Sequence, residues 1–257
     1  MSLGVALAVA LGAGGVPGGG QAPFSPKSVG GLTLWLDASQ ISGIAEGGAV
    51  ATWPDLSGLG NSASQGTVSD QPAYYATTAG KTVNGKPAVW WENSADFLKT
   101  PTFASALTTG ALFVVAQITA GNTGIYVLMD TNDSGGAQRW GFGPGFGTSG
   151  GTQSSPQSLW QGNYINAATI TAIAPQQQWT ALYGGAAGST IRQNGTALVT
   201  ADAGTNTFQG ATIGATYSGG DTLWTGCICE LLLYSGIPTA TQIGAIEGYL
   251  KSKWGTP

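Results

Sequence analysis

Short apolar stretches separated by glycine- and asparagine-rich turns recur along most of the chain. The most apolar are Ala111–Ile118 and Trp224–Tyr234, and each has the length of one buried strand. Further strands are predicted at Leu32–Leu36, Ala49–Trp53, Gln71–Tyr75, Pro87–Trp91, Asp96–Thr100, Gly124–Asp130, Gln138–Phe142, Ser158–Gly162, Ala168–Ile173, Trp179–Tyr183, Ser189–Gln193, Thr196–Thr200 and Ala211–Gly214. Asn84-Gly85 and Asn194-Gly195 are strong hairpin turn signals. Many short strands in succession predict an all-β, two-sheet antiparallel sandwich.

The pattern changes to a helical one only at the end of the chain. Thr239 with Gln242 three residues later fits a capping box, in which each side chain satisfies a free backbone N–H of the first turn. Apolar residues then follow at spacings of three and four and predict one helix with a buried face: Ile243, Ile246, Leu250 and Trp254. Gly255 can end this helix in the left-handed conformation.

Four motifs carry a resemblance to a known family. They are Leu34-Trp35-Leu36-Asp37-Ala38-Ser39, Trp53-Pro54-Asp55-Leu56-Ser57-Gly58, Asn84-Gly85-Lys86-Pro87-Ala88-Val89, and the closing Ile228-Cys229-Glu230-Leu231-Leu232-Leu233-Tyr234 with Lys253-Trp254-Gly255. Together they resemble the concanavalin A-like, laminin-G-type jelly-roll domains found in bacterial surface proteins and phage virion proteins. The resemblance implies a jelly-roll sandwich with one C-terminal helix, and gives Glu230 a structural place in its strand.

Composition restricts the chemistry more than it identifies it. Only 8% of the residues are charged, 43 of the 257 are glycine, and the formal net charge is −4. Eight basic residues without a cluster exclude a nucleic-acid partner, since a phosphate backbone needs clustered cations. The absence of histidine excludes Ser-His-Asp, Cys-His and zinc-water catalysis. Cys227 and Cys229 are two apart in one strand, at the limit of disulfide geometry, which favours free, buried thiols.

The first 28 residues differ from the rest and are assigned to an N-terminal arm and linker, followed by one domain over Val29–Pro257. The apolar stretch Val5–Ala13 is too short to span a bilayer and has no basic residue before it, unlike a signal peptide. We expect an extended arm that binds other virion proteins or copies of the same chain. An apolar tail folded onto its own domain is the alternative.

The glycine-dense segment Thr131–Gln157 is the expected recognition surface, because long loops of this kind tend to be functional. A structural contact between subunits is the alternative for this segment. Sugar binding needs exposed aromatic rings that stack on pyranose faces. Four aromatic residues in or near predicted loops are the candidates for it: Trp140, Phe146, Trp160 and Tyr164. Packing or a subunit interface is the competing interpretation for each of them.

Calcium is the one candidate cofactor. Asp130, Asn132 and Asp133 offer three oxygen-bearing side chains in four residues, as a hard cation requires. Asp55 and Asn61 form a weaker second set. The competing interpretation is that these residues form turns by bonding their own backbone.

A glycoside hydrolase needs paired carboxylates about 5–9 Å apart, and the four glutamates do not supply such a motif. Glu92 and Asp96 come nearest, but their spacing is an ordinary surface arrangement. The expected function is therefore a non-enzymatic structural protein of a phage or phage-like particle, located in the virion and able to bind host-surface glycans. The alternative is a secreted or surface carbohydrate-binding module.

Overall fold

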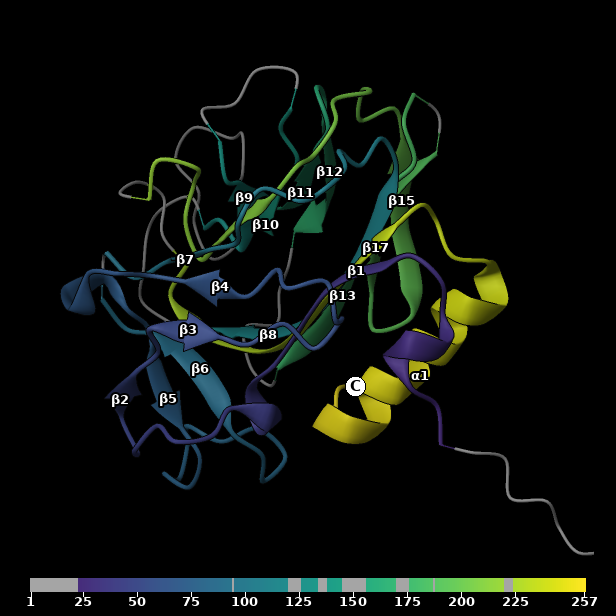
Figure 1. Ribbon diagram of the computed structural model, residues 1–257. Helices are drawn as coiled ribbons and strands as arrows, with labels where there is room; N and C mark the ends of the chain where they lie inside the picture. Colours follow the sequence, from purple (N-terminus) through teal and green to yellow (C-terminus); the bar gives the residue numbers. More distant parts are fainter. Residues whose placement is uncertain are drawn as a thin grey trace, which may run out of the picture.

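The computed structural model describes residues 23–93, 95–119, 126–133, 138–144, 156–169, 176–186, 188–219 and 224–257. Within them the chain forms two antiparallel sheets and one α-helix, as predicted (Figure 1). The first sheet contains β1 (Leu32–Asp37), β2 (Gly48–Ala49), β5 (Ala73–Tyr75), β6 (Ala88–Trp91), β8 (Gly110–Ile118), β13 (Gln177–Tyr183), β14 (Ser189–Gln193), β15 (Thr196–Ala201) and β17 (Gly226–Ser235). The second contains β3 (Thr52–Trp53), β4 (Ala63–Ser64), β7 (Leu98–Lys99), β9 (Met129–Thr131), β10 (Gly141–Pro144), β11 (Pro156–Trp160), β12 (Tyr164–Thr169) and β16 (Ala211–Ile213).

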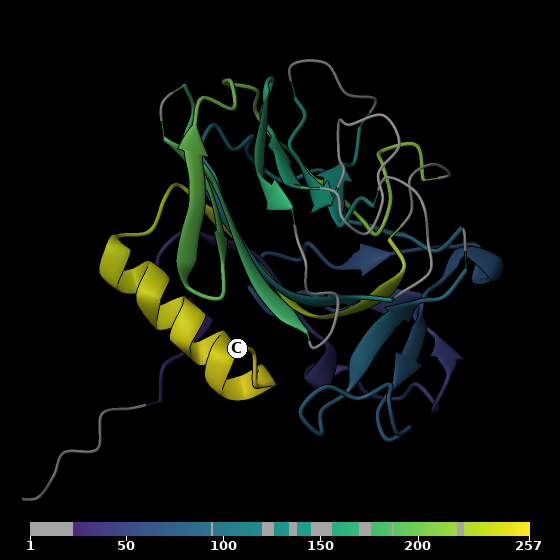
Figure 2. The same cartoon turned by 180° about the vertical axis from the view of Figure 1, so that it is seen from behind.

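The strands β8 and β17 form the centre of the first sheet, and both of their faces are buried. Along β8, Leu112 and Val114 face the other sheet, while Phe113 and Val115 face the helix α1 (Ala240–Trp254). A strand covered on both sides needs apolar residues at every position, which explains the unbroken apolar runs in the sequence. Figure 2 shows α1 lying across the outer face of this sheet.

The helix α1 begins and ends where the sequence pattern places it. Thr239 and Gln242 form both bonds of the capping box, and Gly255 ends the helix at a φ of 65°. The four apolar residues of its predicted stripe are all buried: Ile243, Ile246, Leu250 and Trp254. The local signals of this segment are therefore confirmed.

The strand boundaries differ from the prediction at two places that affect topology. Ala49–Trp53 was expected as one strand, but Gly48–Ala49 pairs in the first sheet and Thr52–Trp53 in the second. The chain crosses between the sheets at residues 50–51, where a single apolar stretch gives no sign of the crossing. Ala168–Ile173 was also expected as a strand, whereas the observed strand is Tyr164–Thr169 and residues 170–175 lie outside the described part of the chain.

Both asparagine–glycine turns are present. Asn194 and Gly195 have φ values of 47° and 82° and join β14 directly to β15. Asn84 and Gly85 have φ values of 49° and 67°, but their turn closes only an isolated bridge between Val83 and Lys86. The side-chain amide of Asn84 donates to the carbonyl of Lys253 at 3.0 Å, so this turn contacts the end of α1.

Candidate functional site

The free edge of β1 is closed by the loop that follows β3. The carboxylate of Asp55 accepts the backbone N–H of Trp35 at 3.0 Å, and the backbone N–H of Leu56 donates to the carbonyl of Trp35 at 2.8 Å. The side-chain amide of Asn61 donates to the carbonyl of Thr33 at 2.8 Å. The loop thus satisfies backbone groups that an open sheet edge would expose. It also fixes Asn61 beside β1.

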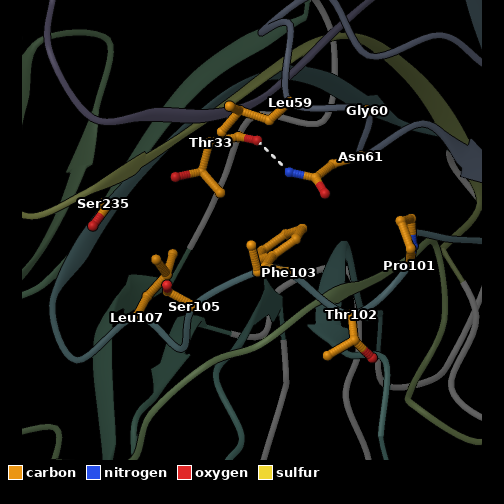
Figure 3. Close-up of a pocket in the computed structure, with 11 residues that line it drawn as sticks. Thr33, Leu59, Gly60, Asn61, Pro101, Thr102, Phe103, Ser105, Leu107 and Ser235 are labelled. Atoms are coloured by element: carbon orange, nitrogen blue, oxygen red, sulfur yellow. Dashed lines mark hydrogen bonds between the residues drawn. The ribbon is translucent and has the colours of Figure 1, made fainter.

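A pocket of about 470 Å³ lies between this loop and the segment that leads from β7 to β8. Figure 3 shows Thr33, Leu59 and Asn61 on one wall, facing Phe103 and Leu107 on the other. The remaining lining residues are small or polar: Gly60, Pro101, Thr102, Ala104, Ser105 and Ser235. None of the eleven lining residues is charged. We call this cavity the uncharged pocket.

Several polar groups of the uncharged pocket have no partner among the described residues. Asn61 donates one side-chain N–H to the carbonyl of Thr33, but its Oδ1 accepts no hydrogen bond from the described residues. The hydroxyl groups of Thr102, Ser105 and Ser235 also make no hydrogen bond with the described part of the chain. Apolar contact comes mainly from the side chain of Leu59, which is 64% exposed, because Phe103 on the opposite wall is only 3% exposed. The uncharged pocket can therefore offer an apolar surface and unused hydrogen-bonding groups to a ligand.

A second cavity, of about 380 Å³, lies beside α1 and has different chemistry. It is lined by Lys27, Trp35, Asp37, Gln40, Leu56, Tyr249 and Lys253. Behind it lies Glu230, whose side chain is fully buried. A β-bulge places Glu230 there: Ile228 pairs with Ala116 and Glu230 with Val115, so Cys229 is an extra residue in β17. The bulge turns Glu230 toward the helix. We call this cavity the charged pocket.

Glu230 is the centre of a hydrogen-bond network. Its carboxylate accepts from the indole N–H groups of Trp35 and Trp254, at 2.8 and 2.7 Å, and from the hydroxyl of Tyr249 at 2.9 Å. The ammonium of Lys253 lies 2.8 Å from Glu230 Oε2 and also donates to Asp37. Burial, followed by the charge of Asp37, raises the pKa of Glu230. The structural role expected of Glu230 is thus confirmed.

The polar groups of the charged pocket largely bond to one another. The three N–H groups of Lys253 reach Asp37, Glu230 and the hydroxyl of Tyr249. The other carboxylate oxygen of Asp37 accepts from the backbone N–H and hydroxyl of Ser39. A buried charge needs such partners, and here they come from the protein itself. The charged pocket therefore joins α1 to the sheet, and of its charged lining residues only Lys27 takes no part in this network.

Trp140 was expected at a ligand surface, and this prediction is wrong. Its side chain is fully buried, with its ring stacked 4.3 Å from that of Tyr183 and 5.1 Å from that of Phe208. Its indole N–H donates to the carbonyl of Asn206 at 2.6 Å. Trp140 is a core residue because the rings of Tyr183, in β13, and Phe208 stack against it.

Trp160 and Tyr164 are brought together, as their common assignment to a ligand surface requires. They lie at facing positions of the β11–β12 hairpin, with ring centroids 4.2 Å apart. Tyr164 is 42% exposed and Trp160 is partly buried. Their role as a sugar platform stays a prediction. Phe146, the fourth candidate, lies outside the described residues, as does much of the glycine-dense segment Thr131–Gln157.

The predicted calcium ligands do not form an oxygen cage around a free site. Asp130 is fully buried and its carboxylate holds the guanidinium of Arg139 at 2.8 and 2.7 Å. Asn132 donates its side-chain amide to the carbonyl of Thr100 at 3.2 Å. Asp133 follows at an exposed position. With Arg139 bound to its main carboxylate, the set does not favour a cation, and no metal-binding cluster of acidic, cysteine or histidine residues occurs in the described ranges.

The weaker candidate sets also have structural partners. Asp55 accepts the backbone N–H of Ser57 and of Asn61, at 2.8 and 2.9 Å, as a turn-forming aspartate does. Asp96 was expected at the surface with Glu92, but it is only 1% exposed and accepts the backbone N–H groups of Glu92 and Asn93. Cys227 and Cys229 are free and buried, as predicted.

Sequence reasoning missed the uncharged pocket. Its walls come from β1, the loop after β3, the segment before β8 and the end of β17, which are far apart in the sequence. No motif marks Pro101–Leu107, and its hydroxyl residues resemble those of any loop. Only the structure shows that the side-chain N–H of Asn61 is bonded to Thr33 while its Oδ1 is not bonded.

No protein-family model matches the sequence, and a comparison with curated proteins also found no match. Solved structures do match. Domain 4 of an extracellular arabinanase from Geobacillus stearothermophilus, in complex with arabinotriose, has a TM-score of 0.51 and 14% identity, with 83% of this chain and 96% of that chain covered. The likeness establishes the fold.

Two larger proteins contain a similar sandwich. The sialidase of Trypanosoma rangeli, in complex with sialic acid, gives a TM-score of 0.55 at 11% identity over 88% of this chain. The binding domain of botulinum neurotoxin serotype D gives 0.54 at 10% identity over 90% of this chain. The present chain spans 34% of the sialidase and 55% of the neurotoxin domain. These relations confirm the β-sandwich fold and do not show a phage origin.

No helix in the described ranges is long and apolar enough to cross a membrane.

Proposed function

We propose that this protein is a carbohydrate-binding module that holds its ligand in the uncharged pocket. The observation that carries the proposal is the combination of apolar wall residues with side-chain hydroxyl groups and an amide oxygen that have no partner among the described residues. A sugar presents C–H groups on its ring faces and hydroxyl groups at its edges. The walls formed by Leu59 and Phe103 suit the former, and Asn61, Thr102 and Ser105 suit the latter.

The fold adds support by analogy alone. Domain 4 of the arabinanase carries arabinotriose on a sandwich of similar size, and fold similarity at 14% identity does not transfer a site. It makes carbohydrate binding the better of the two functions considered for the sequence. A location outside the cell or at its surface fits this function.

We propose binding without catalysis. The uncharged pocket holds no titratable side chain that could donate or accept a proton. Asp37 and Glu230 are the nearest pair of carboxylates to the charged pocket, but both are bound by Lys253 and Glu230 is fully buried. Neither arrangement favours hydrolysis.

The virion role is the second hypothesis, and it would place the N-terminal arm against a neighbouring subunit. Residues 1–22 lie outside the described part of the chain, so the structure offers no contact in its support. Glycan binding at the pocket would be compatible with a particle protein, and purification of the chain from its source would separate the two.

The test is binding of the full chain to an array of plant, bacterial and animal glycans, followed by calorimetry on the best ligand. We expect saturable binding to at least one glycan. Ser105→Trp should abolish binding, because the larger side chain fills the uncharged pocket. The fold should tolerate the change, since Ser105 is exposed and makes no side-chain hydrogen bond within the described residues.

Thr108→Trp is the matched control, since Thr108 is exposed on the same segment but does not line the pocket. Both variants should melt at the temperature of the unmodified protein. The proposal fails if no glycan binds, or if Ser105→Trp binds as well as Thr108→Trp.

A further inference from the structure

We infer that the uncharged pocket takes a neutral sugar unit and discriminates against anionic sugars such as sialic or uronic acids. This inference rests on the proposed function and adds the class of ligand. Arabinotriose and sialic acid, the ligands of the two solved complexes above, belong to opposite sides of this division. The charges around the pocket decide between them.

A fixed negative charge lies behind the pocket wall. Asp55 Oδ2 accepts the backbone N–H of Asn61 at 2.9 Å, which places a carboxylate directly behind a lining residue. Asp55 has no salt-bridge partner within the described residues, and its carboxylate is held by neutral donors from Trp35, Ser57 and Asn61. A second carboxylate brought into the pocket would meet an uncompensated negative field.

Five of the eight basic residues are engaged elsewhere in the protein. Four basic residues are ion-paired with carboxylates: Lys81, Arg139, Arg192 and Lys253. Lys99 donates to the carbonyl of Tyr217 at 2.6 Å. None of the eight basic residues of the chain lines the pocket. An anionic sugar would therefore lose its hydration without gaining an ion pair.

The hydrogen-bonding groups point to the same ligand class. Asn61 donates one of its two side-chain N–H groups to the carbonyl of Thr33, and its Oδ1 can accept a hydrogen bond from a ligand. A sugar hydroxyl can donate that bond, whereas an ionised carboxylate can only accept. The hydroxyls of Thr102, Ser105 and Ser235 can donate or accept and tolerate different hydroxyl arrangements. Neutral hydroxyl-rich ligands satisfy all of these groups.

The experiment compares neutral oligosaccharides with acidic counterparts: arabinotriose and lactose against trigalacturonic acid and sialyllactose. Calorimetry with the full chain should give neutral ligands an affinity at least roughly tenfold higher than the acidic ones. The affinity for the neutral ligand should not change between about 0.05 and 0.5 M salt, because no ion pair is formed.

Charge reversal provides the matched variants. Ser105→Lys should raise the affinity for the acidic ligand by roughly tenfold through a charge-assisted hydrogen bond. Thr108→Lys adds the same charge outside the pocket and should change it little. Preferred binding of the acidic ligand by the unmodified chain would overturn the inference and leave sugar binding intact. If neither ligand class binds, on this panel or on a wider glycan array, the proposed function itself fails.

Discussion

The two pockets of this protein are similar in size and opposite in the state of their polar groups. In the charged pocket, Asp37, Glu230 and Lys253 bond to one another and to neighbouring side chains. In the uncharged pocket, Asn61 Oδ1 and three hydroxyl groups have no partner within the described residues. Residue types alone would select the charged pocket as the functional one. The hydrogen-bond partners select the other.

The motifs that carry the family resemblance meet around the charged pocket. Trp35 and Asp37 line it, Glu230 lies behind it and Lys253 crosses it. Asn84 contacts the end of α1 through the carbonyl of Lys253. These motifs thus build the fold, which explains why they predicted the architecture well.

Lys253→Met should have the largest effect and should separate the two pockets most clearly. It leaves Asp37 and Glu230 facing each other without their cation, and loss of one buried charge partner typically costs about 3–5 kcal/mol in the free energy of unfolding. Denaturant unfolding measures this. Glycan affinity should remain unchanged as long as the protein is folded.

Lys251→Met is the control for that variant, because Lys251 is exposed on the same helix and forms no ion pair in the described residues. Its effect should stay within about 0.5 kcal/mol. Equal destabilisation by both variants would contradict the role assigned to the charged pocket.

Thr239→Ala tests the other end of α1. The variant removes the capping side chain that accepts the backbone N–H of Gln242, which should lower the free energy of unfolding by about 1 kcal/mol. Thr239→Ser keeps the cap and serves as the control. A loss of glycan affinity in Thr239→Ala at a temperature where it is fully folded would show that the helix and the uncharged pocket are coupled.

Leu59→Ala acts on the uncharged pocket only. Leu59 is 64% exposed, so its truncation should leave stability unchanged while weakening glycan binding by about 1 kcal/mol, roughly fivefold. Val68→Ala is the matched control, since Val68 is 72% exposed and lies outside the pocket. Calorimetry with the preferred glycan distinguishes them, and identical affinities would remove Leu59 from the site.

A change of pH should also affect the two pockets differently, in protein stability for the charged pocket and in glycan affinity for the uncharged one. Folding raises the pKa of Glu230 above its ordinary value of 4.5. The stability that this shift contributes is therefore fully present below pH 4.5 and is lost as the pH rises through the raised pKa. The difference in unfolding free energy between wild type and Glu230→Gln should fall over this interval. Glycan affinity should stay constant, because no titratable residue lines the uncharged pocket.

The sequence predicted the features that depend on residues close together in the chain, and it missed those that depend on residues far apart. The capping box at Thr239, the turn at Asn194-Gly195 and the strand β8 are local patterns, and all three were predicted correctly. Trp140 was misassigned because its glycine-rich neighbourhood resembles a loop, whereas Tyr183 and Phe208 enclose its ring. That burial comes from residues distant in the sequence.

The uncharged pocket could not be predicted for the same reason, because its residues are far apart in the sequence. Thr33, Asn61, Ser105 and Ser235 meet only after the sheet has formed, and none of them is unusual in its own segment. Glu230 could be recognised as structural through its motif, but the bulge at Cys229 that turns it toward α1 could not.

Amide NMR of the full chain during titration with its preferred neutral glycan tests the central claim most directly, because one spectrum reports on both pockets. We predict shifts at the side-chain amide of Asn61 and at the backbone amides of Gly60 and Ser105, with the indole signals of Trp35 and Trp254 unchanged. Shifts at the two indole signals without any at Asn61 would place the ligand in the charged pocket and contradict this account.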